Sequence, residues 1–311
     1  MKITILGAGA MGSLFGGYLS MENEVWMVDV NSTLVERISA SGVRIREKDG
    51  EGLYHPKAVT GTAGLGTMDL IIVFVKAMFS RSALEANRAL IGPDTYIMTL
   101  QNGAGHEQVL LDFADRKHVV IGTTKHNSSL IEPGYVNHGG GGHSTIGLLD
   151  GGSSVLQPIA DTFTACGFET SVSDEVLASI WNKLFTNVSA SAMTAVLGTS
   201  LDFLKDSENA WKLVEQLVRE AVKVANAEGL SFDEETIVSD VRTLVENAHN
   251  AYTSIYADIR DGRRTEVDTI SGSVVQAARR LGVPVPGHEF VVTLIHALED
   301  KNRLYKGEAR G

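Results

Sequence analysis

The first residues of the chain carry a glycine pattern that few folds can accommodate. A short apolar run over 3–6 leads into Gly7, Gly9 and Gly12, and a helical pattern opens at Met11. In the spacing G-x-G-x-x-G, the first glycine permits a tight turn from strand to helix, and the second lets a pyrophosphate approach the backbone. The third lets the helix pack closely on the strand, and the helix N-terminus offers N–H groups to phosphate. The pattern predicts a dinucleotide site formed by Gly7, Ala8, Gly9, Ala10, Met11 and Gly12.

A second predicted strand, over 24–28, ends in an acid. Asp29 stands 22 residues after Gly7, which completes the dinucleotide fingerprint. An acid at this point accepts hydrogen bonds from the ribose hydroxyls of NAD and repels the 2′-phosphate of NADP. Asp29 could instead cap the following helix, but Asn31 or Ser32 is better placed for that role. We therefore expect NAD as the cofactor and NADP as the less favoured one.

Composition excludes several classes of protein. The 311 residues suggest two domains, and a net charge of −11 argues against nucleic acid as a partner. No apolar run is long enough to predict a membrane span. Cys166 is the single cysteine, so no intramolecular disulfide is possible, which fits a cytoplasmic location. We expect Cys166 to be a small buried side chain.

The pattern of predicted elements changes once along the chain. Before about residue 172, strands alternate with helices, and the apolar runs over 68–77 and 95–103 are typical of central parallel strands. From Glu175 onward one helix follows another, including a single predicted helix over 233–259, and Asp174 is predicted to cap the first of them. We predict an α/β Rossmann domain over 1–172 and an all-α domain over 173–311. An apolar helical domain also suggests a homodimer.

Three polar side chains share one predicted helix face. Lys183, Asn187 and Ser191 are spaced i, i+4, i+8, beside a stripe of apolar residues. From spacing alone, a solvated ridge on the helix surface is a better interpretation than the wall of a polar pocket. Trp181 and Trp211 are predicted to be core residues.

Three histidines lie in or near a predicted hairpin that contains the glycines at 139–142. His126, His138 and His143 raise the possibility of a metal site. They lack metal-ligand spacing and an accompanying cluster of carboxylates. We therefore predict no metal site, and we expect the hairpin to lie on the edge of the sheet.

Six stretches stand out, in order along the whole chain. They are "ILGAGAMGSLFGGYL", "VKA" at 75–77, "QNG" at 101–103, "PGYVNHGGGGHSTIG", "WNKLFTN" at 181–187 and "TSIYADIRDGRRTEVDTISG" at 253–272. Together they resemble the ketopantoate reductase family. The resemblance implies a Rossmann domain, a helical domain like the C-terminal domain of 6-phosphogluconate dehydrogenase, and an active site between them. It also implies an NAD(P)-dependent oxidoreductase that transfers hydride to a 2-keto acid.

The resemblance also implies roles for single residues. Lys183 would be the general acid/base, Asn187 would hold the substrate, and Ser254 would take its carboxylate. Glu266 would support the lysine, although it could also be a first-turn acid of a helix that follows Thr265. Hydride arriving at a keto carbon leaves negative charge on the oxygen, which a lysine ammonium can neutralise by donating a proton. The positions implied near the nicotinamide ribose and substrate are Lys76, Asn102, Gly103 and Glu266.

An acid/base lysine that works near neutral pH should have a lowered pKa. Burial would lower the pKa of Lys183, and the charge of Glu266 would raise it. Closure of the two domains, with a hinge near 172–176, would exclude water from the reaction.

Two positions depart from the family pattern. The family commonly has a second asparagine where this chain has Ser191, and the neighbours of Ser191 are small, which leaves room for a bulky substituent. Asp29 replaces the basic or small polar residue of NADPH-using members. Together they predict NAD-dependent reduction of 2-keto acids branched or bulky at C3 to D-2-hydroxy acids, as in a D-mandelate type dehydrogenase. An NADPH-dependent ketopantoate reductase and a non-catalytic dinucleotide-sensing protein remain the alternatives.

Overall fold

The computed structural model describes residues 1–248 and 251–305, and the chain divides into two compact units. The first unit comprises Met1–Gln101 and His106–Ser179. The second begins at Ile180 and also includes the short segment Asn102–Gly105. The first unit combines a largely parallel sheet with helices and the second is helical, so the predicted fold class is confirmed. None of the helices in the described ranges is both long and apolar enough to span a membrane.

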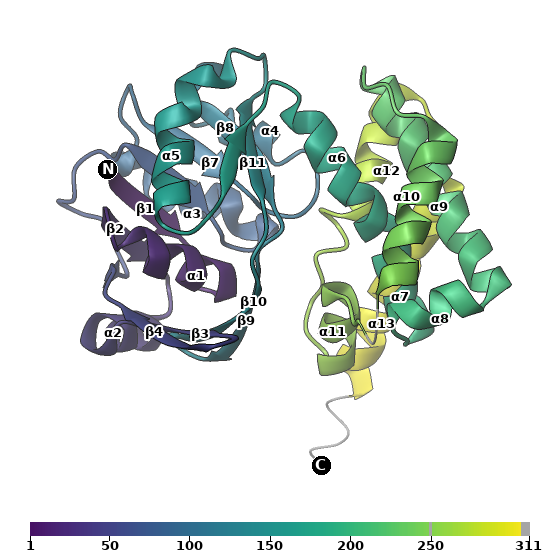
Figure 1. The fold of residues 1–311 in the computed structure, drawn as a ribbon, viewed down its shortest axis with the longest axis horizontal. Helices are drawn as coiled ribbons and strands as arrows, with labels where there is room; N and C mark the ends of the chain where they lie inside the picture. The colour runs from purple at the N-terminus through teal and green to yellow at the C-terminus, as the bar shows by residue number, and fades with distance from the viewer. Residues whose placement is uncertain (249–250, 306–311) are drawn as a thin grey trace. The chain divides into compact units, whose positions relative to one another are not determined.

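The first unit is built on an eight-stranded sheet (Figure 1). Its strands lie in the order β12-β11-β8-β7-β6-β1-β2-β5, and all neighbours are parallel except β8 and β11. The apolar run predicted as a central strand contains β6, which is buried at every residue. The strands are β1 (Lys2–Leu6), β2 (Glu24–Val28), β5 (Lys57–Val59), β6 (Leu70–Val73), β7 (Tyr96–Thr99), β8 (Val119–Thr124), β11 (Ser144–Leu148) and β12 (Thr170–Val172).

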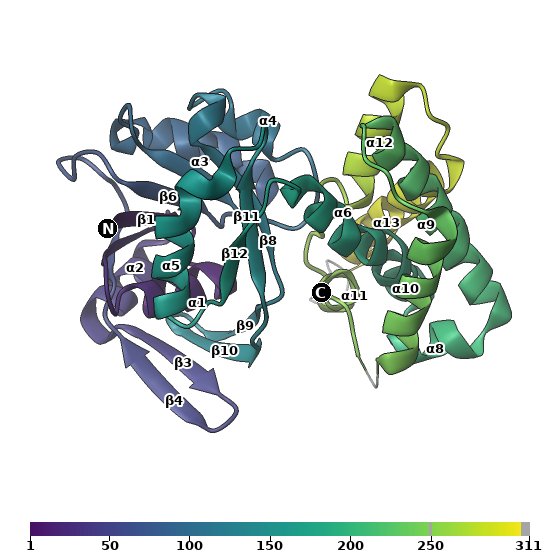
Figure 2. The ribbon, with the colours of Figure 1, turned by 45° about the horizontal axis from the view of Figure 1, so that its top comes forward.

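A second, four-stranded sheet has the order β4-β3-β10-β9 (Figure 2). It comprises β3 (Val43–Glu47), β4 (Gly50–Tyr54), β9 (Asn127–Glu132) and β10 (Tyr135–Gly140). The prediction of a hairpin on the edge of the main sheet was wrong. Strand β10 pairs with β9 and β3 in the second sheet, where Val136 is fully buried, whereas β11 joins the main sheet. The glycines at 139–142 lie where the chain passes from one sheet to the other.

Helix α1 (Ala10–Leu19) lies between the two sheets (Figure 1). Leu14, Phe15 and Leu19 are fully buried, and the ring of Phe15 stacks on Phe168 with centroids 3.9 Å apart. Burial on both sides fixes the helix, and with it the loop between β1 and α1. The other helices of this unit are α2 (Ser32–Ser41), α3 (Ser80–Ala86), α4 (Glu107–Leu110) and α5 (Gln157–Ala165). Cys166 is fully buried in the same core.

The helical unit packs around α9 (Glu208–Ala227), which contacts α8, α10, α12 and α13. Trp181 and Trp211 are buried in this core, as predicted. The helices that accompany α9 are the part of α6 (Val176–Thr186) from Ile180 onward, α7 (Ala192–Leu197), α8 (Leu201–Asp206), α10 (Glu234–Asn247), α11 (Ser254–Asp261), α12 (Ser271–Leu281) and α13 (Pro286–Tyr305). A π-helical turn, Asn187–Ser191, joins α6 to α7.

Two local predictions about the helices were wrong. The single helix predicted over 233–259 is two helices, because α10 ends at Asn247 and the side chain of Thr253 caps a new helix, α11. Asp174 does not cap α6 through its Oδ1, which instead accepts a hydrogen bond of 2.8 Å from the N–H of Ser153. For Asp174, the segment at Ser153 supplies a competing hydrogen bond.

A buried carboxylate joins α9 to the start of α13. Glu220 accepts hydrogen bonds from the N–H groups of Gly287 at 3.0 Å and His288 at 3.1 Å. Any Cβ at position 287 would lie 2.9 Å from the Glu220 carboxylate, so glycine is needed for this approach. The first N–H groups of a helix have no partner within the helix, and a carboxylate there also interacts favourably with the helix dipole.

We predict that Glu220→Ala lowers the free energy of unfolding by about 3 kcal/mol, because one buried and one partly buried N–H group lose a charged acceptor. The free energy of unfolding of Glu220→Gln should lie between that of Glu220→Ala and that of the wild type. The measurement is urea unfolding followed by helical circular dichroism. The control is Lys212→Ala, which breaks an exposed ion pair with Glu208 on the same helix and should have little effect. A loss for Glu220→Ala no larger than that of the control would contradict the prediction.

Candidate active site

The loop between β1 and α1 leaves space where a phosphate would lie. Gly7 has φ +100°, and a Cβ there would lie 2.7 Å from the backbone nitrogen of Val75. A Cβ on Gly12 would lie 1.9 Å from the carbonyl oxygen of Gly7. In contrast, a Cβ on Gly9 would meet no atom within 4 Å. Gly7 and Gly12 therefore serve the close packing of helix on strand, and Gly9 keeps the outer surface of the loop open.

The N-terminus of α1 has the properties of an anion site. Its N-cap residue, Gly9, provides no side-chain cap, and the first turn contains no acidic residue. Ser13 stabilises the loop from inside, since its hydroxyl donates to the carbonyl of Ala8 at 2.9 Å. The hydroxyl of Ser128, on β9, donates to the carbonyl of Ala10 at 3.1 Å. These contacts leave a fixed helix end that can donate N–H groups to a pyrophosphate.

Asp29 bridges the two loops that follow β1 and β2. Its Oδ2 accepts from the N–H of Ala8 at 2.8 Å and its Oδ1 from the N–H of Asn31 at 2.9 Å. Helix α2 is capped by Asn31, whose side chain accepts from the N–H of Leu34 at 3.2 Å. A capping role for Asp29 is therefore excluded. Each carboxylate oxygen retains acceptor capacity that ribose hydroxyls can use.

A glutamine that sequence analysis did not single out joins the ends of β6 and β7. The side-chain amide of Gln101 donates to the carbonyl of Val75 at 2.5 Å, and its oxygen accepts from the hydroxyl of Thr99 at 2.9 Å. Lys76, exposed, directly follows Val75 and precedes a 3₁₀ turn. Gln101 thus fixes the backbone beside Lys76. Its signal in the sequence was only a polar residue at the end of a buried strand.

In the helical unit, Lys183 lies near the C-terminal end of α6. It follows Trp181 and precedes Leu184 and Phe185, all three of which are fully buried. Burial lowers the pKa of the Lys183 ammonium to about 8, because the charged form loses solvation. A lysine with this pKa exchanges a proton close to neutral pH, as an acid/base role requires.

The helix that carries Lys183 continues into the π-helical turn Asn187–Ser191. Single π turns inside α-helices frequently occur at functional sites. Asn187 is half-buried, whereas Ser191 is buried with 7% of its surface exposed. The hydroxyl of Ser189 donates to the carbonyl of Phe185 at 2.5 Å, which occupies a backbone acceptor of the preceding turn. The prediction that Lys183, Asn187 and Ser191 share one face assumed a regular α-helix. It therefore did not include this π-helical turn.

The structure brings Ser191 and the start of α11 together through two threonines. The hydroxyl of Thr194 donates to the carbonyl of Ser191 at 2.8 Å and lies 2.7 Å from the hydroxyl of Thr253. Thr253 caps α11, and Ser254 is the first residue of that helix. Ser254 is exposed at the helix N-terminus, a position that suits a carboxylate ligand.

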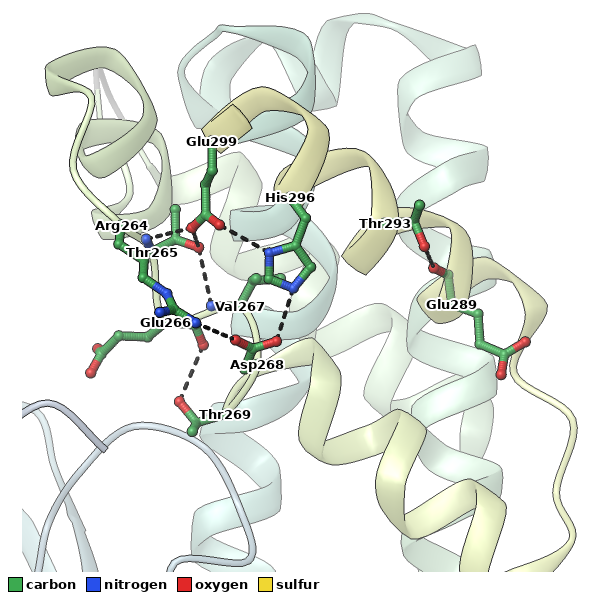
Figure 3. A network of polar contacts seen from close by, with 10 residues as sticks. All are labelled: Arg264, Thr265, Glu266, Val267, Asp268, Thr269, Glu289, Thr293, His296 and Glu299. Carbon is green, nitrogen blue, oxygen red and sulfur yellow. Dashed lines mark hydrogen bonds and ion pairs between the residues drawn. The ribbon is translucent and has the colours of Figure 1, made fainter. Parts of the chain in front are cut away.

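Glu266 lies in a turn before α12 and not inside a helix. Helix α12 begins at Ser271, so the alternative of a first-turn helix acid is excluded. The carbonyl of Glu266 accepts from the N–H of Ile270 at 3.0 Å, and its neighbour Thr265 is held by Glu299 of α13 (Figure 3).

The structure groups the remaining predicted site residues with one unit or the other. Asn102 and Gly103 belong with the helical unit, where the adjacent Ala104 packs against the apolar core. Lys183, Asn187, Ser191, Ser254 and Glu266 lie in that unit, and Gly7, Ala8, Gly9, Ala10, Met11, Gly12, Asp29 and Lys76 lie in the first.

The histidines of the first unit form a chain of side-chain contacts. His126 Nδ1 lies 3.0 Å from His138 Nε2, and His138 Nδ1 lies 2.8 Å from a carboxylate oxygen of Glu47. Burial, and then the proximity of His138, lower the pKa of His126. His143 instead contacts the hydroxyl of Ser171 at 2.7 Å. Within 1–248 and 251–305, no group of three or more His, Cys, Asp or Glu residues is arranged to hold a metal ion.

Comparison with known proteins supports one family along most of the chain. Residues 3–151 match the family model described as Ketopantoate reductase PanE/ApbA. Residues 175–299 match the model of its C-terminal domain. The chain is 32% identical over 308 residues to a 2-dehydropantoate 2-reductase of Halobacterium salinarum, covering 98% of both chains. It is 31% identical to the enzyme of that name from Pyrococcus horikoshii, covering 96% of this chain and 98% of the relative.

Solved structures lead to the same family. A D-mandelate dehydrogenase, solved as a ternary complex with NADH and anilino(oxo)acetate, is 31% identical with a TM-score of 0.90. The match covers 97% of this chain and all of the neighbour. Because the match spans both units, the chain belongs to the ketopantoate reductase family and is an oxidoreductase that acts on a small keto or hydroxy acid with a nicotinamide dinucleotide.

Proposed function

We propose that the protein is an NAD-dependent 2-keto acid reductase, which interconverts C3-branched or bulky 2-keto acids and D-2-hydroxy acids. The observation that carries the reaction type is the half-buried Lys183, whose pKa is lowered to about 8. At neutral pH most of this lysine is an ammonium that can donate a proton, and a useful fraction is the amine that can accept one. Such a group supports reaction in both directions.

Asp29 supports NAD as the cofactor. Its carboxylate is held by the N–H groups of Ala8 and Asn31, beside the open surface of Gly9. A ribose with two free hydroxyls can donate to this acceptor, whereas a 2′-phosphate would be repelled by it. The D-mandelate dehydrogenase that is similar to this chain was solved with NADH.

In the proposed mechanism, the bound reduced nicotinamide supplies the hydride, and the chain supplies the proton and the binding groups. The ammonium of Lys183 donates a proton to the substrate oxygen as negative charge develops on it. We assign Asn187 to the substrate hydroxyl or carbonyl and Ser254, at the N-terminus of α11, to the carboxylate. We assign Glu266 to the support of Lys183 and the substrate, and we assign Lys76, Asn102 and Gly103 to binding of the nicotinamide ribose.

Ser191 supports a bulky substrate. It has 7% of its surface exposed and is flanked in the chain by the small residues Ala190 and Ala192, and a serine is shorter than the asparagine that the family commonly has there. The second candidate function is NADPH-dependent reduction of ketopantoate, and the name shared by the curated relatives favours it. A protein that senses the dinucleotide without catalysis would have no need for Lys183 with a lowered pKa. The homodimer and the cytoplasmic location stay predictions.

We predict that Lys183→Ala lowers kcat by ~10²-fold or more, because the proton donor is lost. Binding of NADH, measured by fluorescence titration, should be unchanged. In the wild type, kcat for reduction should fall as pH rises through about 8, since the ammonium is the reactive form, and kcat for oxidation should rise. Lys205→Ala, which removes a half-buried lysine paired with Asp202 on α8, is the matched control. Near-normal turnover of Lys183→Ala would assign the proton transfer to another group.

We predict that kcat/KM is ~10²-fold higher with NADH than with NADPH. Two unit charges 4 Å apart interact by roughly 4 kcal/mol at an effective dielectric constant of 20, so even a partly screened repulsion is large. Asp29→Ser should erode the preference, and adding Val30→Arg should begin to invert it. Val30 is 97% exposed, so this change leaves the Asn31 cap intact. Val30→Arg alone is the control, and a wild-type preference for NADPH would refute the assignment.

We predict that benzoylformate or 2-ketoisovalerate is reduced with a higher kcat/KM than ketopantoate. Ser191→Asn should move the preference toward ketopantoate by about 1 kcal/mol, or roughly fivefold, because the amide adds one hydrogen-bond partner. Ser189→Ala is the control, since it changes a buried serine of the same turn whose hydroxyl is bonded to the backbone. If ketopantoate is the best substrate of the wild type, the second candidate function is correct.

A further inference from the structure

The segment that carries Glu266 depends on tertiary contacts for its conformation. Residues 262–270 connect α11 to α12 and contain no helix or strand. Val267 and Ile270 are buried in the core of the helical unit, and Glu266 is half-buried between them and Thr265. A catalytic carboxylate on an irregular segment needs other groups to fix the backbone on either side of it.

The first fixed point is Thr265, which precedes Glu266. Its N–H and its hydroxyl both donate to Oε1 of Glu299, each at 2.7 Å. The same hydroxyl accepts from the N–H of Val267 at 3.2 Å. Thr265 is 5% exposed, so these bonds are shielded from water. One carboxylate oxygen on α13 therefore orients the backbone immediately before Glu266.

The second fixed point is Asp268, two residues after Glu266. Its Oδ1 contacts Nε2 of His296 at 2.9 Å, and Nδ1 of His296 contacts Oε2 of Glu299 at 2.9 Å. Arg264 lies 3.5 Å from the other oxygen of Asp268. The network thus runs from Thr265 through Glu299 and His296 to Asp268, and it closes around the Glu266 backbone (Figure 3).

The side chain of Glu266 is directed away from this network (Figure 3). The network therefore acts on Glu266 through the backbone and leaves its carboxylate to other contacts. His296 can donate to both carboxylates only when both of its ring nitrogens carry protons. Burial alone would lower the pKa of His296, but the bonds to Glu299 and Asp268 outweigh it and raise the pKa. A surface hollow lined by His296 and Glu299 is also lined by the charged residues Arg263, Asp300 and Arg303.

We propose that Glu299 is a positioning residue, which holds the Thr265–Asp268 segment so that Glu266 is presented to the lysine and the substrate. The inference rests on the proposed role of Glu266. Nothing in it requires Glu299 to touch the substrate, the cofactor or Lys183.

The first experiment compares two substitutions of Glu299 in the full-length protein. Glu299→Gln keeps an oxygen that can accept from Thr265 and should lower kcat by no more than about threefold. Glu299→Ala removes the acceptor and should lower kcat by ~10-fold or more, with KM for NADH unchanged. Glu289→Ala is the matched control. Glu289 lies on α13, as Glu299 does, but away from the network (Figure 3), and its loss breaks an ion pair with Arg279 of α12; this variant should keep wild-type kcat.

A double-mutant cycle separates positioning from a general structural effect. If Glu299 acts through Glu266, the pair Glu266→Gln and Glu299→Ala should lose no more kcat than Glu266→Gln alone. If the two losses multiply, Glu299 acts independently of Glu266 and the proposal is wrong. A wild-type kcat in Glu299→Ala would also overturn it.

Two further measurements keep the test decisive. If Glu299→Ala fails to fold, Thr265→Val and Thr265→Ser replace it. The valine lacks the donor hydroxyl and should lower kcat, and the serine should restore it; equal kcat values would overturn the proposal. If Glu266→Gln itself turns over normally, the proposed role of Glu266 fails. If instead Glu266→Gln lowers kcat and Glu299→Ala does not, the proposed role of Glu266 stands and only the positioning role of Glu299 is refuted.

Discussion

The close approach of α1 to β1 is the constraint on which the first unit depends. A Cβ at Gly12 would lie 1.9 Å from the carbonyl oxygen of Gly7, so the helix can begin where it does only without a side chain there. This approach sets the direction of the N–H groups at the start of α1 and places the N–H of Ala8 against Asp29. The proposed phosphate site and the proposed ribose site therefore depend on one packing contact.

The helical unit depends on a different principle, which is the use of carboxylates to complete backbone segments. Glu220 of α9 caps α13, and Glu299 of α13 orients the turn before α12. In each case the acceptor is charged and the donors are N–H groups that the local secondary structure leaves unpaired. Burial has the opposite consequence for Lys183, because it destabilises the ammonium and lowers its pKa. Charged groups thus stabilise the unit where they meet backbone donors, and their charged form is destabilised where burial dominates.

The sequence was sufficient for features that depend on local chemistry. The glycine loop, the acid at the end of β2 and the Asn31 cap follow from steric and hydrogen-bond preferences of a few consecutive residues. The π-helical turn and the break between α10 and α11 were not predictable, because apolar periodicity continues across both. The network around Glu299 was hidden for another reason. Thr265 and Glu299 are 34 residues apart in the chain, and no rule of sequence spacing connects them.

The hydrogen bonds of Asp29 explain why the proposed preference for NAD should be difficult to evade. A flexible surface acid could rotate away from a 2′-phosphate at little cost. Asp29 is held by one N–H on each oxygen, from Ala8 and Asn31, and hydrogen bonds to charged groups contribute about 1.5–3 kcal/mol each. Rotation would therefore forfeit roughly as much free energy as the repulsion of about 4 kcal/mol that it relieves. Under the proposed cofactor assignment, binding of NADPH would incur one of these two free-energy costs, whereas the ribose hydroxyls of NADH could donate to an acceptor that is already in place.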